Sequence, residues 1–281
     1  MKTLEQGLFT GERALFHSSE LIIKDSVFAD GESPLKESSN IELSSSIFKW
    51  KYPLWYCKDV KALGCVLLES ARSGIWYTHG IEMKNCVIEA PKTFRRSSKI
   101  ALTDCNMPNA KESMWNCSDI ILKNVTLAGD YFAMGSENIT AENLTVNGNY
   151  AFDGAKNITV RNSRLISKDA FWNTENVTVY DSVIIGEYLG WNSKNLTFIN
   201  CYIESNQGLC YIENLKIENS KLINTDLAFE FSSVDAEVKS EIDSVKNPIS
   251  GRIRAKAIRE LIMEETMIDP GKTEITTEAD K

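Results

Sequence analysis

Five of the six tryptophans recur at regular separations, and amides follow several of them. The five are Trp55, Trp76, Trp115, Trp172 and Trp191, separated by 21, 39, 57 and 19 residues. Asparagines stand directly after three of them, at Asn116, Asn173 and Asn192. Flat rings stack on the C–H faces of sugars, and amides hydrogen-bond to hydroxyl groups. A fold that gathers these residues on one face would give that face the chemistry of a carbohydrate-binding site.

Four charged residues near this set are the candidates for catalysis: Asp153, Asp169, Arg95 and Arg96. Glycoside hydrolysis uses two carboxylates about 5 to 9.5 Å apart, and we expect Asp153 and Asp169 to be about 10 Å apart, which is marginal. The two arginines precede Asp153 by three repeats, about 14 Å at the spacing of stacked strands, which is too far for one reacting centre. The sequence therefore assigns no catalytic residue. An enzyme built on this face would be a polysaccharide lyase or a glycoside hydrolase.

The tryptophan spacing reflects a repeat of about nineteen residues that organises most of the chain. The first apolar residue of each repeat serves as its anchor. The anchors are Leu21, Ile41, Val60, Ile81, Ile100, Ile120, Ile139, Ile158, Val177, Leu196, Leu215, Val234 and Ile253. A nearly constant step of this length indicates one supersecondary unit that is stacked on itself.

Within each repeat the side chains follow the period of a β-strand. In one copy, Val177 and Val179 alternate with Thr178 and Tyr180, and Asp181 then breaks the run. Asn, Asp or Gly flank this strand in most repeats, and these residues tolerate the left-handed conformation of a tight corner. The pattern predicts an all-β fold, a single-stranded right-handed parallel β-helix of about 12–13 coils with three short strands per coil.

The tryptophans fall on the third strand of each coil, next to a column of apolar residues that is the better candidate for the core. If that apolar column points inward, the tryptophans point outward. Three interpretations of such an aromatic face stay open: rings packed on each other or beneath the C-terminal segment, a glycan-binding groove, and an interface with another protein. The exposure of the rings distinguishes these interpretations.

We expect one domain over residues 1–281, with an N-terminal edge at 1–17, coils at 18–258, and a C-terminal cap and frayed tail at 259–281. The repeat weakens after Val234, because Lys239 and Glu241 fall at positions that should be apolar, and it resumes at Ile253.

Composition excludes several classes of function. A net charge of −8 and a pI near 5.1 argue against a nucleic-acid-binding surface. No apolar run is long enough to cross a membrane and no secretory signal is recognisable, which predicts a cytoplasmic protein. The seven cysteines include no Cys-x-x-Cys pair, and four of them share a repeat position with serines. We therefore expect buried free thiols, no metal site and no cofactor.

The repeat period, the corner asparagines and the Ser/Cys column together resemble the right-handed parallel β-helix superfamily of pectate lyases and polygalacturonases. Residues 4–13, Leu-Glu-Gln-Gly-Leu-Phe-Thr-Gly-Glu-Arg, and residues 247–251, Asn-Pro-Ile-Ser-Gly, are more closely similar to a microbial single-domain family of unknown function. This resemblance implies the fold and the length but no activity. The Asp-Asp and Gly-His-Gly motifs of polygalacturonases are missing between Asn224-Thr225-Asp226 and Arg252-Ile253-Arg254.

The sequence thus offers two functional hypotheses. The first is a protein that binds or processes a carbohydrate along the aromatic face. The second is a non-catalytic scaffold that binds another protein or a second copy of the chain. Neither hypothesis includes a nucleic acid or a membrane as partner.

Overall fold

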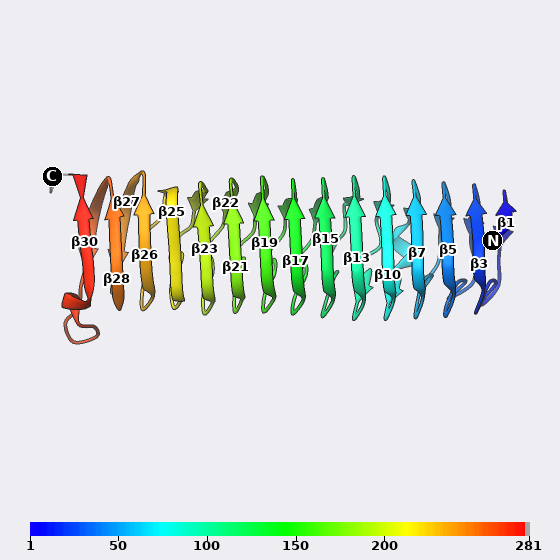
Figure 1. Ribbon diagram of the computed structural model, residues 1–281, viewed down its shortest axis with the longest axis horizontal. Helices are drawn as coiled ribbons and strands as arrows, with labels where there is room; N and C mark the ends of the chain where they lie inside the picture. The colour runs from blue at the N-terminus through cyan, green and yellow to red at the C-terminus, as the bar shows by residue number, and fades with distance from the viewer. Residues whose placement is uncertain (279–281) are drawn as a thin grey trace. The chain divides into compact units, whose positions relative to one another are not determined.

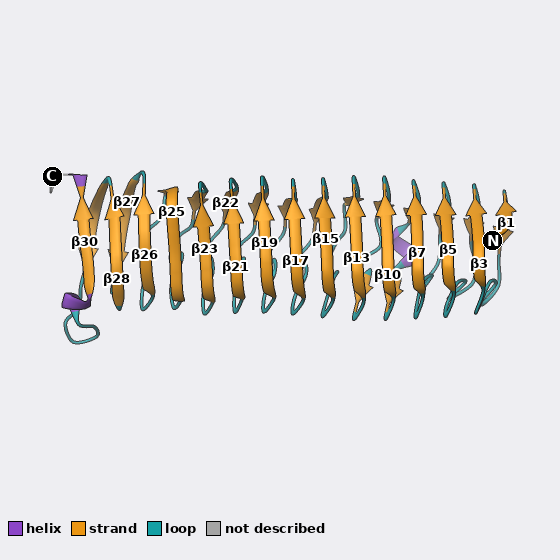
Figure 2. Ribbon diagram, viewed as in Figure 1, coloured by secondary structure: helices purple, strands orange, loops and turns teal. Residues whose placement is uncertain are grey.

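The computed structural model describes residues 1–278, and it divides the chain into two compact units, Met1–Thr145 and Val146–Lys281. Each unit consists of parallel strands that succeed one another along the chain, with loops and turns between them (Figures 1 and 2). The all-β parallel solenoid predicted from the repeat is confirmed.

The first side of every coil is a long strand. In the first unit these strands are β1 (Lys2–Glu5), β3 (Ser19–Lys24), β5 (Ser39–Ser44), β7 (Lys58–Leu63), β10 (His79–Lys84), β13 (Ser98–Thr103), β15 (Ser118–Lys123) and β17 (Glu137–Glu142). In the second unit they are β19 (Lys156–Arg161), β21 (Glu175–Tyr180), β23 (Lys194–Ile199), β25 (Glu213–Ile223), β26 (Ser233–Val238), β28 (Ser250–Ala255) and β30 (Thr273–Thr277).

The second side is a shorter strand that follows the first corner. These strands are β2 (Leu8–Phe9), β4 (Val27–Phe28), β6 (Ile47–Phe48), β8 (Val66–Leu67), β11 (Val87–Ile88), β14 (Asn106–Met107), β16 (Thr126–Ala128), β18 (Thr145–Asn147), β20 (Arg164–Ile166), β22 (Val183–Ile185) and β24 (Tyr202–Glu204). In the last full repeat, β25 runs through the corner and supplies both sides.

The third side is mostly turn where the sequence predicts a strand. The strands outside the first two sides are β9 (Ile75–Trp76), β12 (Phe94–Arg95), β27 (Glu241–Lys246) and β29 (Ala257–Ile262), and the short 3₁₀ helices are η1 (Glu69–Ala71) and η2 (Pro270–Lys272). Residues such as Tyr52, Tyr131 and Phe171 take left-handed backbone angles on this side, which interrupts strand geometry.

The anchor residues form one continuous buried file in each unit. In the second unit Ile158 pairs with Val177, Val177 with Leu196, and Leu196 with Leu215. All four side chains are buried. The same registration joins the anchors of the first unit from Leu21 to Ile139. Residues one full repeat apart therefore lie directly over one another, as the constant step predicts.

Serine and cysteine occupy one inward-facing column, in which side chains accept hydrogen bonds from backbone N–H groups at the corner of the preceding coil. The N–H of Ser26 donates to Ser46 Oγ at 3.3 Å, and the N–H of Cys201 donates to Ser220 Oγ at 2.9 Å. The cysteines are free and buried. Burial raises the pKa of Cys57, Cys117 and Cys210 to about 12. These thiols are packing groups, as predicted.

The C-terminal register differs from the prediction. The ladder between β25 and β26 shifts between Ile217 and Ser220, so Val238 occupies the buried position that the repeat assigns to Lys239. In the next coil Val234 pairs with Gly251, which places Ile253 opposite Ala236, so Ile253 is not an anchor. Shorter corners shift the later residues out of the nineteen-residue repeat, which is why the repeat weakens in the sequence after Val234.

The predicted ends also differ. Strands β1 and β2 pair with β3 and β4, so residues 1–17 form a coil of the same kind as those that follow. Strand β30 pairs with β28, so residues 273–277 are an ordered rung where the sequence predicts a frayed tail. Residues 279–281 of that predicted tail lie outside the described residues. These additional coils at both ends explain why the number of coils exceeds the predicted 12–13.

Among residues 1–278, no helix has the length and apolar character that crossing a membrane would require.

Candidate functional site

The tryptophans of the first unit stack face to face along the coil axis. The rings of Trp55 and Trp76 are 5.1 Å apart between centroids and nearly parallel, at 7°. Arg95 takes the next place in the column, where its guanidinium lies 4.8 Å from the Trp76 ring centroid and 4.5 Å from that of Trp115. Trp55, Trp76, Arg95 and Trp115 thus form one pile of planar groups.

The second unit contains a shorter pile. Trp172 and Trp191 are 5.7 Å apart and nearly parallel, at 5°. The ring of Tyr150 meets Trp172 edge-on at 6.0 Å, and the ring of Tyr211 meets Trp191 at 5.0 Å and 69°.

Each indole is also fixed by a hydrogen bond to the backbone of the next coil. The Nε1–H groups of Trp55, Trp76, Trp115, Trp172 and Trp191 donate to the carbonyl oxygens of Ser73, Lys92, Tyr131, Tyr188 and Gln207. All five indoles are half-buried. Because the neighbouring planar groups cover much of the ring faces, this geometry favours the structural interpretation of the column over the stacking of sugars on it.

The asparagines that follow the tryptophans are corner residues. Asn116, Asn173 and Asn192 have φ angles of 52°, 54° and 58°. The amide of Asn173 donates to Asp153 Oδ1 at 2.9 Å. Their role in ligand binding stays a prediction.

The acidic candidates for catalysis lie in the second unit, and they have different environments. Asp153 is half-buried and accepts the hydrogen bond from Asn173. Asp169 is only 1% exposed, and its Oδ1 has no hydrogen-bond partner among the described residues. Burial raises the pKa of the Asp169 carboxyl, which a hydrogen bond from Tyr150 partly offsets.

The basic candidates for catalysis lie in the first unit. The guanidinium of Arg95 has its Nη2 3.6 Å from Glu112 Oε2, while its Nε and Nη2 lack hydrogen bonds within residues 1–278. Arg96 lies 5.9 Å from the ring centroid of Tyr77. Both arginines are therefore engaged with aromatic rings, and Arg95 acts as a planar member of the tryptophan pile.

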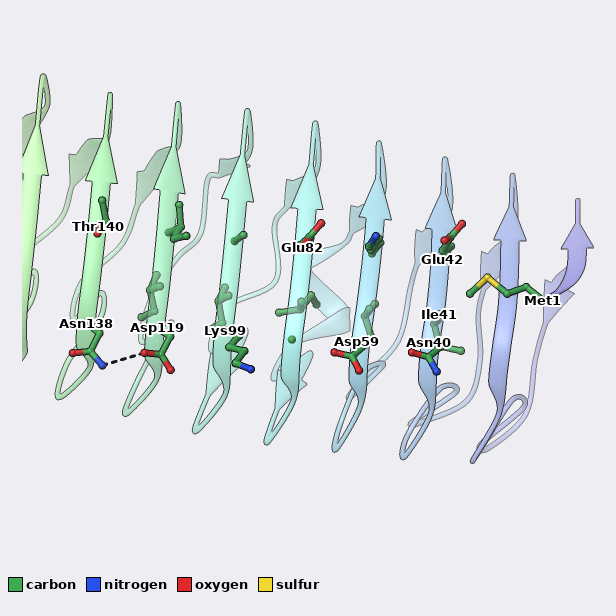
Figure 3. Close-up of a pocket in the computed structure, with 18 residues that line it drawn as sticks. Met1, Asn40, Ile41, Glu42, Asp59, Glu82, Lys99, Asp119, Asn138 and Thr140 are labelled. Atoms are coloured by element: carbon green, nitrogen blue, oxygen red, sulfur yellow. Dashed lines mark hydrogen bonds between the residues drawn. The ribbon is translucent and has the colours of Figure 1, made fainter.

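A groove on the outer face of the long strands was not anticipated from the sequence. It lies in the first unit, has a volume of about 600 Å³ and crosses β5, β7, β10, β13, β15 and β17 (Figure 3). One row of its lining consists of Asn40, Asp59, Gly80, Lys99, Asp119 and Asn138, and the other of Glu42, Lys61, Glu82, Ala101, Ile121 and Thr140. A second hollow of about 430 Å³ shares Glu42, Lys61, Glu82 and Ala101 with it. We call the larger hollow the strand-face groove.

Five charged side chains of the strand-face groove have no polar partner. Glu42, Asp59, Lys61, Glu82 and Lys99 make neither hydrogen bonds nor ion pairs within the described chain. Elsewhere, oppositely charged residues on neighbouring coils pair with each other. Examples are Lys51–Glu32 at 2.9 Å, Lys156–Glu175 at 3.1 Å and Lys194–Glu213 at 3.0 Å. The groove therefore offers donors and acceptors that the fold itself leaves unused.

The row of corner residues along the groove is interrupted, unlike the same row in the second unit. In the second unit the same row is an unbroken ladder, in which Asn176 donates to Asn157, Asn195 to Asn176, and Asn214 to Asn195. In the first unit Gly80 interrupts the row, and a Cβ atom at that position would lie 2.7 Å from Asp59 Oδ1. Lys99, at φ 53°, shows that this corner does not demand glycine for its backbone angle. Gly80 instead leaves room for the Asp59 carboxylate.

The sequence did not predict this groove, because its lining residues change type from coil to coil and form no recurring motif. One feature of the sequence does indicate the groove. At the position directly after each anchor, three charged residues are followed by the small Ala101 and then by the exposed Ile121. Within residues 1–278 no three His, Cys, Asp or Glu side chains are grouped so as to hold a metal ion.

Comparison with solved structures gives matches of low similarity. The A-module of the mannuronan C-5 epimerase AlgE4 of Azotobacter vinelandii is 7% identical, with a TM-score of 0.35 over 98% of this chain and 88% of that chain. PfbA, a surface adhesin of Streptococcus pneumoniae, is 10% identical with a TM-score of 0.36 over 76% and 71%. HetL, a pentapeptide repeat protein of Nostoc sp. strain PCC 7120, is 10% identical with a TM-score of 0.28 over 80% and 92%. These likenesses carry no argument about function.

No curated protein matches the chain. The model of one family does match, over residues 2–276, and that family is described as a protein of unknown function. The resemblance stated from the sequence is thereby confirmed, and the chain belongs to the DUF3737 family.

Proposed function

We propose that this protein binds a carbohydrate, and that the strand-face groove of the first unit holds it. The observation that carries the proposal is the set of five charged side chains in the groove that have no polar partner within the described chain. The tryptophan pile of the first unit, whose ring faces are engaged within the fold, supports the coils that carry the groove.

The lining suits hydroxyl groups because it presents both signs of charge side by side. A hydroxyl donates one hydrogen bond and accepts up to two, so it can bridge a carboxylate and an ammonium group. Asp59 and Lys99 flank Gly80 in the corner row, and Lys61 pairs with Glu82 in the other row. Hydrogen bonds to charged groups are stronger than neutral ones, which compensates for a site that is open to water.

The groove also has apolar surface for the C–H faces of sugar rings. Ile121 is 57% exposed in the same row as Ala101, and Met1 lies over β3 at one end (Figure 3). Exposed apolar side chains beside polar ones are the usual lining of a ligand site.

A glycan array with the labelled full-length protein tests the proposal, followed by calorimetric titration of any glycan that binds. The Lys61→Met/Glu82→Gln variant should bind at least tenfold more weakly than the unmodified protein. The matched Lys123→Met/Glu142→Gln variant changes the same residue types on the same face, outside the groove, and should bind normally. Absence of any glycan ligand would overturn the proposal and leave the protein-binding scaffold as the better hypothesis.

The titration also locates the site. Trp172→Phe removes the indole donor of the second pile but keeps a ring in place. Binding that is weakened by Trp172→Phe and unaffected by the groove variant would move the site to the tryptophan face.

A further inference from the structure

We infer that the third side of the coils in the first unit binds an acidic segment of a partner protein. The surface consists of the third-side segments 49–56, 69–77, 89–96 and 108–116, and we call it the basic face. The segments lie side by side, because the N–H groups of Leu54, Ile75 and Lys92 donate to carbonyl oxygens of the next segment at 2.8, 2.7 and 2.9 Å. The inference is independent of the proposed function, because the strand-face groove lies on the long strands.

The charge of the basic face is opposite in sign to that of the whole chain. Its segments contain seven lysines and arginines and three glutamates, a net charge of +4, whereas the chain carries a formal charge of −8. Four of the cationic side chains make neither a hydrogen bond nor an ion pair within the described residues. These four are Lys49, Arg72, Arg96 and Lys111. The face therefore presents positive charge that the fold does not neutralise, and this charge complements an anionic partner.

Exposed aromatic side chains accompany the unpaired charges. Tyr56 is 48% exposed, Trp50 39% and Tyr77 36%. The rings of Tyr56 and Tyr77 stack at 4.8 Å and 5°, and the guanidinium of Arg96 lies 5.9 Å from the Tyr77 ring centroid. Tryptophan, tyrosine and arginine are the residue types that contribute most binding energy in protein–protein interfaces. Because stacking already holds these side chains, they lose little conformational entropy when a partner binds.

The aromatic geometry favours a protein segment over a nucleic acid. Single-stranded nucleic acids bind largely by stacking their bases on exposed ring faces. Here Tyr77 covers one face of the Tyr56 ring, and the Lys36 ammonium group lies 5.6 Å from the Tyr56 centroid. The ring edges and hydroxyl groups are left to contact a partner.

The charge distribution favours a short acidic segment over a long polyanion. A nucleic acid or an acidic polysaccharide extends beyond the basic face and meets the negative field of the rest of the chain. A short segment responds mainly to the charges it contacts, because the Debye length is about 8 Å at physiological ionic strength.

Two labelled peptides that differ only in charge test the inference. In the acidic peptide Glu and Asp alternate with Leu, and its control has Gln and Asn in place of the acids. Fluorescence anisotropy titration with the full-length protein at low salt should show the acidic peptide binding at least tenfold more tightly than its control. Added salt should reduce this preference, since it screens exposed charges. Equal affinity for the two peptides would overturn the inference.

Charge-reversal variants locate the binding surface. Arg72→Glu/Arg96→Glu should weaken binding of the acidic peptide at least tenfold. The matched Lys84→Glu/Lys123→Glu variant makes the same change of net charge on β10 and β15, outside the basic face, and should keep most of the affinity. An equal loss in both variants would mean that the peptide responds to net charge alone, and the basic face would then not be its site.

A variant that keeps the net charge tests the aromatic side chains. Tyr56→Asn/Tyr77→Asn removes both exposed rings and should weaken binding of the acidic peptide at least fivefold. The fold should survive, because Asn116 occupies the equivalent corner at φ 52°, close to the φ angles of 56° and 57° at the two tyrosines. A circular dichroism melt checks this. Unchanged binding would reduce the contact to attraction between charges and overturn the docking surface.

An oligothymidylate that carries the same label tests the alternative partner. It should bind more weakly than the acidic peptide. Tighter binding of the oligothymidylate, lost in Arg72→Glu/Arg96→Glu, would assign the basic face to a nucleic acid and overturn the inference. The glycan array and the groove variants are read separately, so either proposal can fail while the other stands.

Discussion

At the scale of single residues, Asp169 is the side chain whose environment fits its chemistry least. Its carboxyl is buried, and Oδ1 has no hydrogen-bond partner among the described residues. Burial raises its pKa above the ordinary 3.8. The folded state therefore binds a proton at this carboxyl more tightly than the unfolded chain does, and the charged form carries a penalty at neutral pH.

Replacing this carboxyl should stabilise the protein. We expect Asp169→Asn to raise the free energy of unfolding at pH 7 by about 1 kcal/mol, because it removes a buried charge whose hydrogen bonding is incomplete. The advantage should be complete above the raised folded pKa and should shrink as the pH falls through it towards 3.8, since protonation then relieves the same penalty in the unmodified protein. Urea unfolding at pH 7 and at pH 4 measures both quantities.

Asp169→Glu is the control for this prediction, because it keeps the charge and adds a methylene group to a buried site. It should not stabilise the protein at either pH. An Asp169→Asn variant that is less stable at pH 7 would show that the carboxylate contributes a favourable interaction instead.

At the scale of single elements, the tryptophan pile of the first unit behaves as a structural column of stacked planes. Arg95 takes a tryptophan's place between Trp76 and Trp115. Its neighbours each donate an indole N–H to the third side of the next coil, whereas two nitrogens of Arg95 make no hydrogen bond within residues 1–278. The column therefore accepts arginine because the guanidinium is flat.

Arg95→Trp should consequently raise the melting temperature, by an amount that corresponds to about 1 kcal/mol. The new indole would stack between Trp76 and Trp115, and the carbonyl of Glu112 stands in the repeat position that accepts the other indole N–H groups. Arg95→Lys keeps the charge and loses the plane, so it should lower the melting temperature. Differential scanning calorimetry compares the three proteins, and a stabilising Arg95→Lys would contradict the stacking argument.

The strands also show which features of the fold could be predicted from the sequence and which could not. The strand period, the inward anchors and the Ser/Cys column follow from residue types that recur at one spacing, and the structure confirms them. The register beyond Val234 could not be predicted, because losing a single corner residue shifts every later column while the alternation continues. The third side was predicted as strand because columns of apolar and aromatic residues do not reveal left-handed backbone angles.

The candidate site was harder to predict than the fold. The tryptophans were found from their spacing, but their mutual stacking depends on side-chain rotation, which the sequence does not specify. The strand-face groove depends on the sizes of side chains in adjacent coils. Gly80 and Ala101 lie 21 residues apart in the sequence but on neighbouring strands of one sheet. The repeat places such residues on neighbouring strands, but the hollow that their small side chains leave was visible only in the structure.

At the scale of the whole molecule, each unit is a series of coils in which a coil contacts the coils before and after it within that unit. Stability in such a protein is approximately a sum of coil terms and nearest-neighbour terms, so damage to one coil should remain local. Leu196 is a suitable probe, because it is fully buried in β23 and pairs with Val177 and Leu215 on the adjacent strands.

Leu196→Ala should cost about 3 kcal/mol, the typical price of a large cavity in a packed interior. In hydrogen-exchange mass spectrometry the loss of protection should concentrate in β21, β23 and β25 of the second unit. Strands β5, β7 and β10 of the first unit should keep their protection, because they pair with one another and not with β21, β23 or β25. Thr197→Ala, at the neighbouring outward position of the same strand, should leave the exchange pattern unchanged. Equal loss of protection in both units would mean that the coils unfold as one cooperative block, and the nearest-neighbour description would then be wrong.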